Sequence, residues 1–106
     1  MIAYNKLVRD KIPDIIEQDN KECSIRILDD VEYLKMVDAK LDEELAEYHK
    51  DQNLEELADI LEVLYAATKA RGHSLEELEA CRAKKAEKRG AFEKKIFLES
   101  VCDVDE

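Results

Sequence analysis

Apolar residues recur at helical spacing along most of the chain. Between residues 29 and 50 they return every three or four positions, at Leu34, Val37, Leu41, Leu45 and Tyr48. This spacing is typical of a helix that buries one side. The same pattern occurs in residues 53–71 and 74–89, and in a short segment at 11–19. The pattern therefore predicts four helices.

Polar residues mark where these helices should begin and end. Three predicted N-caps are each followed three residues later by a glutamate, namely Asp29, Asn53 and Ser74. This is the arrangement of a capping box. Gly72 and Gly90 are placed to end the third and fourth helices. For the first helix, Asp10 is the predicted N-cap and Pro13 is tolerated in the first turn.

The rest of the chain predicts little regular structure. Residues 23–28 alternate enough to indicate a short strand, and residues 95–98 (Lys-Ile-Phe-Leu) are a possible partner for it. Residues 1–9 are expected to be extended or irregular, and residues 103–106 to form a loose acidic tail. The expected fold class is thus all-α, with at most a short two-stranded β element.

Composition supports a single helical domain over residues 1–106. Charged residues make up 42% of the chain, and it contains two glycines and one proline, which leaves little material for long loops. The net charge of −10 argues against a nucleic-acid partner, because binding a phosphate backbone needs an excess of cations. A small anionic substrate remains compatible with this charge if metal ions and local basic residues mask the acids.

Cysteine content and hydropathy predict a cytoplasmic location without a membrane partner. The three cysteines, Cys23, Cys81 and Cys102, are scattered, which fits reduced thiols better than a disulfide framework or a zinc site. No apolar run approaches the roughly 20 residues that span a bilayer. The N-terminal residues also lack the apolar stretch of a signal peptide.

Carboxylates fall on the apolar side of two consecutive predicted helices. At about 100° per residue, Glu44 lies inside the apolar stripe of the second helix and Glu47 lies at its border. In the third helix, Glu56 and Asp59 lie on a flank of small apolar residues. Burying an unpaired carboxylate is costly, so a purely structural helix has no reason to place acids there.

Each helix therefore offers a pair of acids one turn apart, Glu44 with Glu47 and Glu56 with Asp59. If the two helices pack antiparallel, four carboxylates converge, and they repel one another unless a cation neutralises them or some bind protons. Oxygen ligands suit Mg²⁺, with Mn²⁺ as a substitute, and the expected chemistry is hydrolysis of a phosphate bond. The alternatives are that these acids are solvated helix faces, and that Glu56 merely completes the Asn53 cap.

A basic stripe follows on the fourth predicted helix. The face that begins with Leu75 and Leu78 continues with Arg82, Lys85 and Arg89. Such a stripe can hold the phosphates of a substrate, since arginine binds them bidentately and lysine as a point charge. The alternative is that these cations pair with surface acids or stabilise the helix C-terminus. A second basic group near the N-terminus consists of Lys6, Arg9 and Lys11.

Three motifs together resemble a known family. Residues 43–47 (EELAE) and 55–59 (EELAD) resemble the double acidic signature of the all-α nucleoside triphosphate pyrophosphohydrolases, the MazG-like superfamily that includes phosphoribosyl-ATP pyrophosphohydrolase. Residues 4–13 (YNKLVRDKIP) and 88–98 (KRGAFEKKIFL) resemble a branch of it described as predicted house-cleaning enzymes for non-standard nucleotides.

The resemblance implies a compact four-helix bundle that assembles as a homodimer or homotetramer. It also implies that the four acids Glu44, Glu47, Glu56 and Asp59 bind Mg²⁺, and that a water molecule activated by the metal or by one of these acids attacks the α–β phosphate linkage. The products would be a nucleoside monophosphate and pyrophosphate. The residues expected to hold the phosphates are Lys85 and Arg89, with Arg82 beside them, and the N-terminal Lys6, Arg9 and Lys11 are expected to act at the site of a neighbouring subunit.

Two alternative functions remain open at this point. One is phosphoribosyl-ATP hydrolysis in histidine biosynthesis, which uses the same chemistry on another substrate. The other is a non-catalytic helical oligomer that binds a nucleotide or a protein partner.

Overall fold

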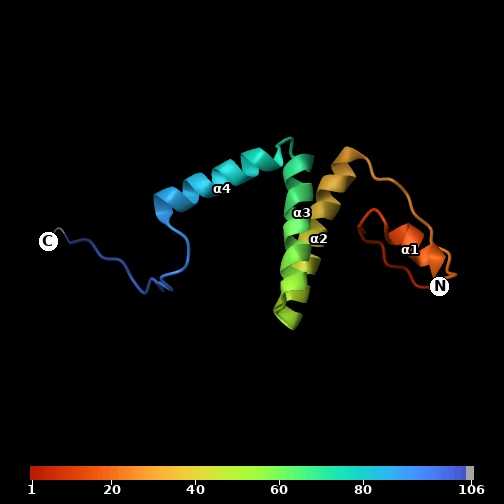
Figure 1. Cartoon of the computed structure of the whole chain (residues 1–106), viewed down its shortest axis with the longest axis horizontal. Coiled ribbons are helices and arrows are strands. Elements are labelled where there is room, and N and C mark those ends of the chain that lie inside the picture. The colour runs from red at the N-terminus through yellow and green to blue at the C-terminus, as the bar shows by residue number, and fades with distance from the viewer. Residues whose placement is uncertain (105–106) are drawn as a thin grey trace. The chain divides into compact units, whose positions relative to one another are not determined.

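Two long helices form a hairpin in the computed structural model, which describes residues 1–104. Helix α2 comprises Asp30–Asp51 and helix α3 comprises Leu54–Ala70. Gln52 adopts a left-handed conformation (φ 51°) and reverses the chain between them. The two helices consequently lie side by side, as Figure 1 shows, and α2 with α3 is the packed helix pair among residues 1–104.

The ends of these helices follow the predicted capping signals. The Asp29 side chain accepts a hydrogen bond from the Glu32 backbone N–H at 2.8 Å, and Asn53 accepts one from the Glu56 N–H at 2.9 Å. Gly72 follows α3 with a φ of 87°, a conformation that side chains disfavour. The predicted N-caps of α2 and α3 and the predicted stop at Gly72 are confirmed.

The two shorter helices are also present. Helix α1 comprises Ile12–Gln18, with Pro13 in its first turn. Helix α4 comprises Leu75–Arg89 and is followed by Gly90, which has a φ of 84°. The prediction that Asp10 caps α1 is wrong, because Lys11 occupies the N-cap position. A turn closed by the Ile12 N–H and the Arg9 carbonyl at 3.1 Å precedes the helix and shifts its start by one residue.

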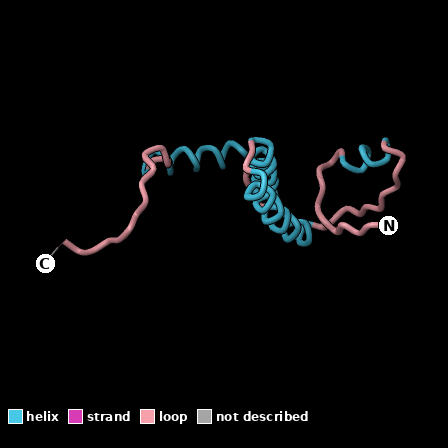
Figure 2. Tube along the Cα trace, turned by 90° about the horizontal axis from the view of Figure 1, so that it is seen from below, coloured by secondary structure: helices cyan, strands magenta, loops and turns pink. Residues whose placement is uncertain are grey.

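The described part of the chain is all-helical, which confirms the predicted class (Figure 2). Residues 23–28 and 95–98 lie in irregular segments, and residues 1–104 contain no strand. A strand needs a second strand to pair with its backbone hydrogen-bonding groups. Residues 23–28 alternate as a strand does, but no second strand pairs with them among residues 1–104. Of the predicted acidic tail, residues 105 and 106 lie outside the described residues.

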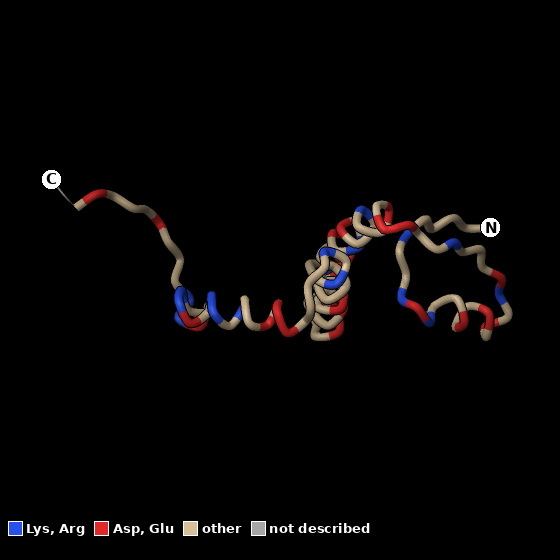
Figure 3. The backbone as a smooth tube through the Cα atoms, turned by 90° about the horizontal axis from the view of Figure 1, so that it is seen from above, with Lys and Arg blue, Asp and Glu red and all other residues tan. Residues whose placement is uncertain are grey.

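The chain divides into two compact units, Met1–Leu75 and Glu76–Glu106. Within the first unit, the helices that pack against each other are α2 and α3, which form a hairpin and not the predicted four-helix bundle. In the second unit, α4 has acids in its first turn and Lys88 and Arg89 in its last. This order, visible as red followed by blue along α4 in Figure 3, complements the helix dipole.

The side of α3 that packs against α2 is its flank of small apolar residues, as the sequence predicts. Val37 and Val63 are the buried apolar residues of the described chain, with 1% and 9% of their surface exposed. The leucines on another side of α3, Leu57, Leu61 and Leu64, are between 38% and 46% exposed. Thus α3 approaches α2 through its small-residue flank, the flank that carries Glu56 and Asp59. Among residues 1–104, no helix has the length and apolar content that a membrane span requires.

Candidate metal centre

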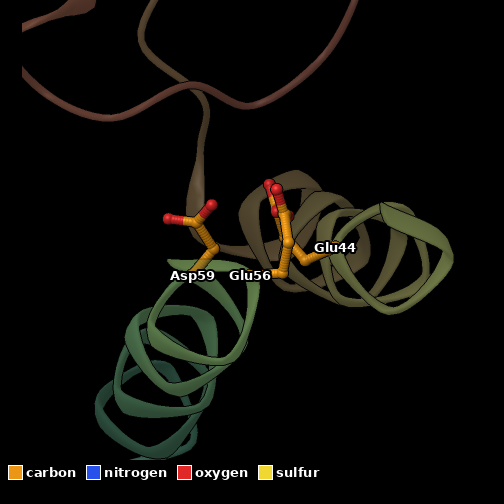
Figure 4. Close-up of side chains that lie close together, drawn as sticks. All are labelled: Glu44, Glu56 and Asp59. Carbon is orange, nitrogen blue, oxygen red and sulfur yellow. The ribbon is translucent and has the colours of Figure 1, made fainter. Parts of the chain in front are cut away.

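Three carboxylates converge on the α2–α3 hairpin. Glu44 of α2 and Glu56 and Asp59 of α3 each offer one oxygen, and these three atoms lie within 4.8 Å of one another. All three residues are half-buried. Figure 4 shows that their side chains point to the same side of the hairpin. The structure therefore brings together three of the four predicted acids.

Local sequence fixes where these acids lie. The Asn53 cap starts α3 so that Glu56 falls in its first turn, where the unpaired N–H groups favour negative charge. Asp59 follows one turn later on the same side of the helix. Helix α2 packs against α3, with Val37 and Val63 buried, and Glu44 reaches the same point from α2.

The fourth predicted acid belongs to a second, adjoining group. Oxygen atoms of Glu47, Asp51 and Glu56 also lie within 4.8 Å of one another. Glu56 is the member common to both groups. Sequence reasoning missed Asp51, because it ended α2 at about residue 50 and placed Asp51 in the turn. Its i, i+4 spacing from Glu47 was the available signal.

Burial and neighbouring negative charges affect the pKa of Glu56. The pKa of Glu56 is raised, first by desolvation and then by the negative charges of Asp59, Asp51, Glu47 and Glu44. A carboxylate surrounded by like charges resists ionisation. A bound cation would remove that penalty, so the shift is consistent with a site that binds metal.

The raised pKa predicts how pH affects the metal-free chain. Because folded Glu56 holds its proton to higher pH than unfolded Glu56, the folded state binds more protons in that window, and the free energy of unfolding falls as pH rises through it. Glutamine does not titrate, so Glu56→Gln removes this fall in the free energy of unfolding. We expect its metal-free melting temperature at pH 7 to exceed that of the unaltered chain by a few degrees, with the difference shrinking towards pH 4.

The measurement is thermal unfolding followed by circular dichroism in a metal chelator. Asp42→Asn is the matched control, because Asp42 is an exposed acid of α2 outside both acidic groups. A lower melting temperature for Glu56→Gln than for this control at pH 7 would contradict the electrostatic account.

A lysine lies beside the three converging acids. The Lys40 Nζ is 3.2 Å from a Glu44 oxygen and 3.4 Å from a Glu43 oxygen. The Lys40 and Glu44 side chains are 14% and 12% exposed, so this ion pair is the most enclosed one in the cluster. Sequence reasoning did not single out Lys40, although its i, i+4 spacing from Glu44 is the signal for such a pair.

The N-terminal basic group reaches the acids of its own chain. The Arg9 Nη2 lies 2.6 Å from the Asp59 Oδ1, and the Lys6 Nζ lies 3.2 Å from the Glu43 Oε1. Lys11 is exposed at the N-cap of α1. Two of the three predicted N-terminal cations thus hold the segment before α1 against the hairpin, and Arg9 contacts a predicted metal ligand directly.

The basic residues of α4 belong to the second unit. Arg82 donates to Glu79 of its own helix at 2.9 Å and 2.5 Å. Lys85 and Arg89 are exposed on α4. A contact of these residues with a substrate's phosphates stays a prediction.

The carboxylates fit Mg²⁺ or Mn²⁺ by donor chemistry. Mg²⁺ binds oxygen ligands at about 2.1 Å, which requires donor oxygens no more than about 4.2 Å apart. The separations here are at most 4.8 Å, so the side chains would have to rotate to bring any longer separation within that limit. All donors are oxygens, which suit Mg²⁺ and Mn²⁺ better than zinc.

Comparisons with known proteins give little guidance. No protein-family model matches the chain, and no solved structure matches it. The chain is similar to an uncharacterized protein of Mycolicibacterium smegmatis, with 52% identity over 42 residues. That match covers 40% of this chain and 43% of the relative. The described chain is therefore an all-helical protein with an acidic cluster on a helical hairpin.

Proposed function

We propose that this protein is a Mg²⁺-dependent nucleotide pyrophosphohydrolase, which cleaves a nucleoside triphosphate, in particular a non-standard or modified one, to the monophosphate and pyrophosphate. The observation that supports this most is the convergence of Glu44, Glu56 and Asp59 from consecutive helices. The resemblance of residues 43–47 and 55–59 to the MazG-like signature points to the same chemistry.

In this proposal the two acidic groups have different tasks. Glu44, Glu56 and Asp59 would hold Mg²⁺, which supplies charge neutralisation at the phosphate oxygens when it is bound. Glu47 and Asp51, in the adjoining group, would orient the attacking water and accept its proton. The water oxygen bonds to the α-phosphorus while the bond from that phosphorus to the α–β bridging oxygen breaks, and pyrophosphate leaves.

The chain also carries cations for the substrate's phosphates. Arg9 lies at the acidic cluster through Asp59, and it would move to a phosphate oxygen when metal replaces it. Lys85 and Arg89 are the residues of α4 proposed for the same task. Arginine suits it because its planar guanidinium binds phosphate bidentately.

Exposed leucines support assembly into a homodimer or homotetramer. Leu54, Leu57, Leu61 and Leu64 follow one another on α3 at spacings of three and four residues, and all are exposed. Contiguous apolar surface of this kind marks interaction sites. A second copy of the chain covering this stripe would supply the core that the hairpin lacks.

The test is release of pyrophosphate from a panel of standard and modified nucleoside triphosphates and phosphoribosyl-ATP. We expect release with Mg²⁺ or Mn²⁺, none in excess chelator, and a monophosphate as the second product. Preference for phosphoribosyl-ATP would assign the protein to that reaction instead. Binding of nucleotide without hydrolysis under both metals would refute catalysis and indicate a binding protein.

A further inference from the structure

A groove lies on the same hairpin, beyond the acidic cluster. It has a volume of about 500 Å³. Residues of both helices line it, namely Asp30 and Tyr33 of α2 and Glu62, Ala66, Lys69 and Ala70 of α3. The mechanism proposed above uses none of these residues.

Helix geometry places the groove on the face that carries the metal ligands. Ala66 follows Asp59 by seven residues, so the two share a side of α3 about 10 Å apart. Tyr33 precedes Glu44 by eleven residues, so these two share a side of α2 about 16 Å apart. A nucleotide whose phosphates lie at Glu44 and Asp59 would therefore extend its sugar along this face and its base towards the groove.

The lining suits a flat ring with polar edges. The half-buried Tyr33 offers an aromatic surface on which a base can stack. Ala66 and Ala70 have small side chains that leave room above α3. The carboxylates of Asp30 and Glu62 accept hydrogen bonds only, and the Lys69 ammonium donates them.

These donors and acceptors discriminate among bases. Guanine presents an amino group and a ring N–H beside a carbonyl oxygen, which match a carboxylate and an ammonium. Adenine and cytosine present an amino group without the neighbouring ring N–H. Uracil and thymine present one ring N–H between two carbonyl oxygens and no amino group, so a carboxylate placed for an exocyclic amino group faces a carbonyl oxygen and loses its hydrogen bond. A site built to pair with a donor rejects the analogue that lacks it.

We propose that this groove is the nucleobase subsite, and that it selects bases with an exocyclic amino group, guanine-type bases first. The inference rests on the proposed function only for the position of the phosphates. It names the class of substrate, which the acidic cluster alone leaves open.

The experiment uses neutral nucleosides without metal, which separates base recognition from the phosphate site. The full chain, labelled with ¹⁵N, is titrated with guanosine and with uridine, and amide chemical shifts are followed by NMR. We expect shifts at Tyr33, Glu62 and Ala66, and affinity for guanosine at least about tenfold higher than for uridine, as one charge-assisted hydrogen bond would give.

Variants test the assigned contacts. Glu62→Gln should weaken guanosine binding about tenfold and leave uridine binding nearly unchanged. Tyr33→Ala should weaken the binding of both nucleosides about tenfold through lost stacking, whereas Tyr33→Phe, which keeps the ring, should bind as the unaltered chain does. Asp42→Asn is the matched control for a lost carboxylate on the hairpin.

Equal binding of the two nucleosides, or shifts away from the groove, would overturn the subsite. Shifts at Tyr33 and Glu62 that follow protein concentration instead of nucleoside would assign the groove to a second copy and overturn it as well. Pyrophosphate release is measured separately. If pyrophosphate is released but guanosine does not bind, the subsite is wrong and the proposed function stands. If guanosine binds but no pyrophosphate is released, the subsite stands and the proposed function is wrong.

Discussion

Glu56→Gln is expected to lower Mg²⁺-dependent pyrophosphate release by about a thousandfold, the effect of removing one strong electrostatic contribution to a transition state. Glu56 is the described residue common to both acidic groups, with oxygens near those of Glu44 and Asp59 on one side and of Glu47 and Asp51 on the other. Its amide variant keeps the size of the side chain but removes a charged ligand.

The measurement is steady-state release of pyrophosphate across Mg²⁺ concentrations, with Asp42→Asn as control. Circular dichroism of the variant should show the helical content of the unaltered chain, because Glu56 takes part in the Asn53 cap through its backbone N–H and not its side chain. Release by Glu56→Gln at a rate near that of the control would contradict a role for Glu56 in binding the metal.

Arg9→Ala is expected to change metal affinity and turnover in opposite directions. In the metal-free chain, Arg9 pairs with Asp59, so it competes with a cation for that carboxylate. An exposed ion pair is worth up to about 1 kcal/mol, and its removal should therefore tighten metal binding by up to about fivefold. If Arg9 then serves the substrate's phosphates, its loss should lower kcat/KM about tenfold or more.

Isothermal titration with Mn²⁺ and steady-state kinetics measure the two effects on the same protein. Lys11→Ala is the matched control, since Lys11 lies nearby in the sequence and is exposed at the start of α1. Weaker metal binding by Arg9→Ala would show that Arg9 supports the site instead of competing for it. A drop in turnover equal to that of Lys11→Ala would remove Arg9 from the phosphate site.

The helices, and the N-caps of α2 and α3, could be predicted because their signals are local. Asp29 and Asn53 bond to backbone N–H groups three residues away, and Gly72 provides the positive φ that ends α3. Periodicity likewise placed Glu44, Glu56 and Asp59 on the sides of α2 and α3 that meet. These features depend on residues within one or two turns of a helix.

Other features depend on partners that are distant in the sequence. The leucines of α3 form a second apolar stripe, which stays exposed because α2 packs against the side that contains Val63. The pairing of Arg9 with Asp59 spans fifty residues, and no spacing rule indicates it. Asp51 was missed for a different reason. The predicted helix ended at about residue 50, whereas α2 includes Asp51 as its last residue.

The most direct test of the account is a crystal structure of the chain grown with Mn²⁺, with anomalous scattering recorded to locate the metal. The account predicts an anomalous peak within coordination distance of carboxylate oxygens of Glu44, Glu56 and Asp59, with the Arg9 guanidinium displaced from Asp59. Crystals with Mn²⁺ bound elsewhere, or with Arg9 still paired to Asp59 and no peak between the three carboxylates, would contradict it.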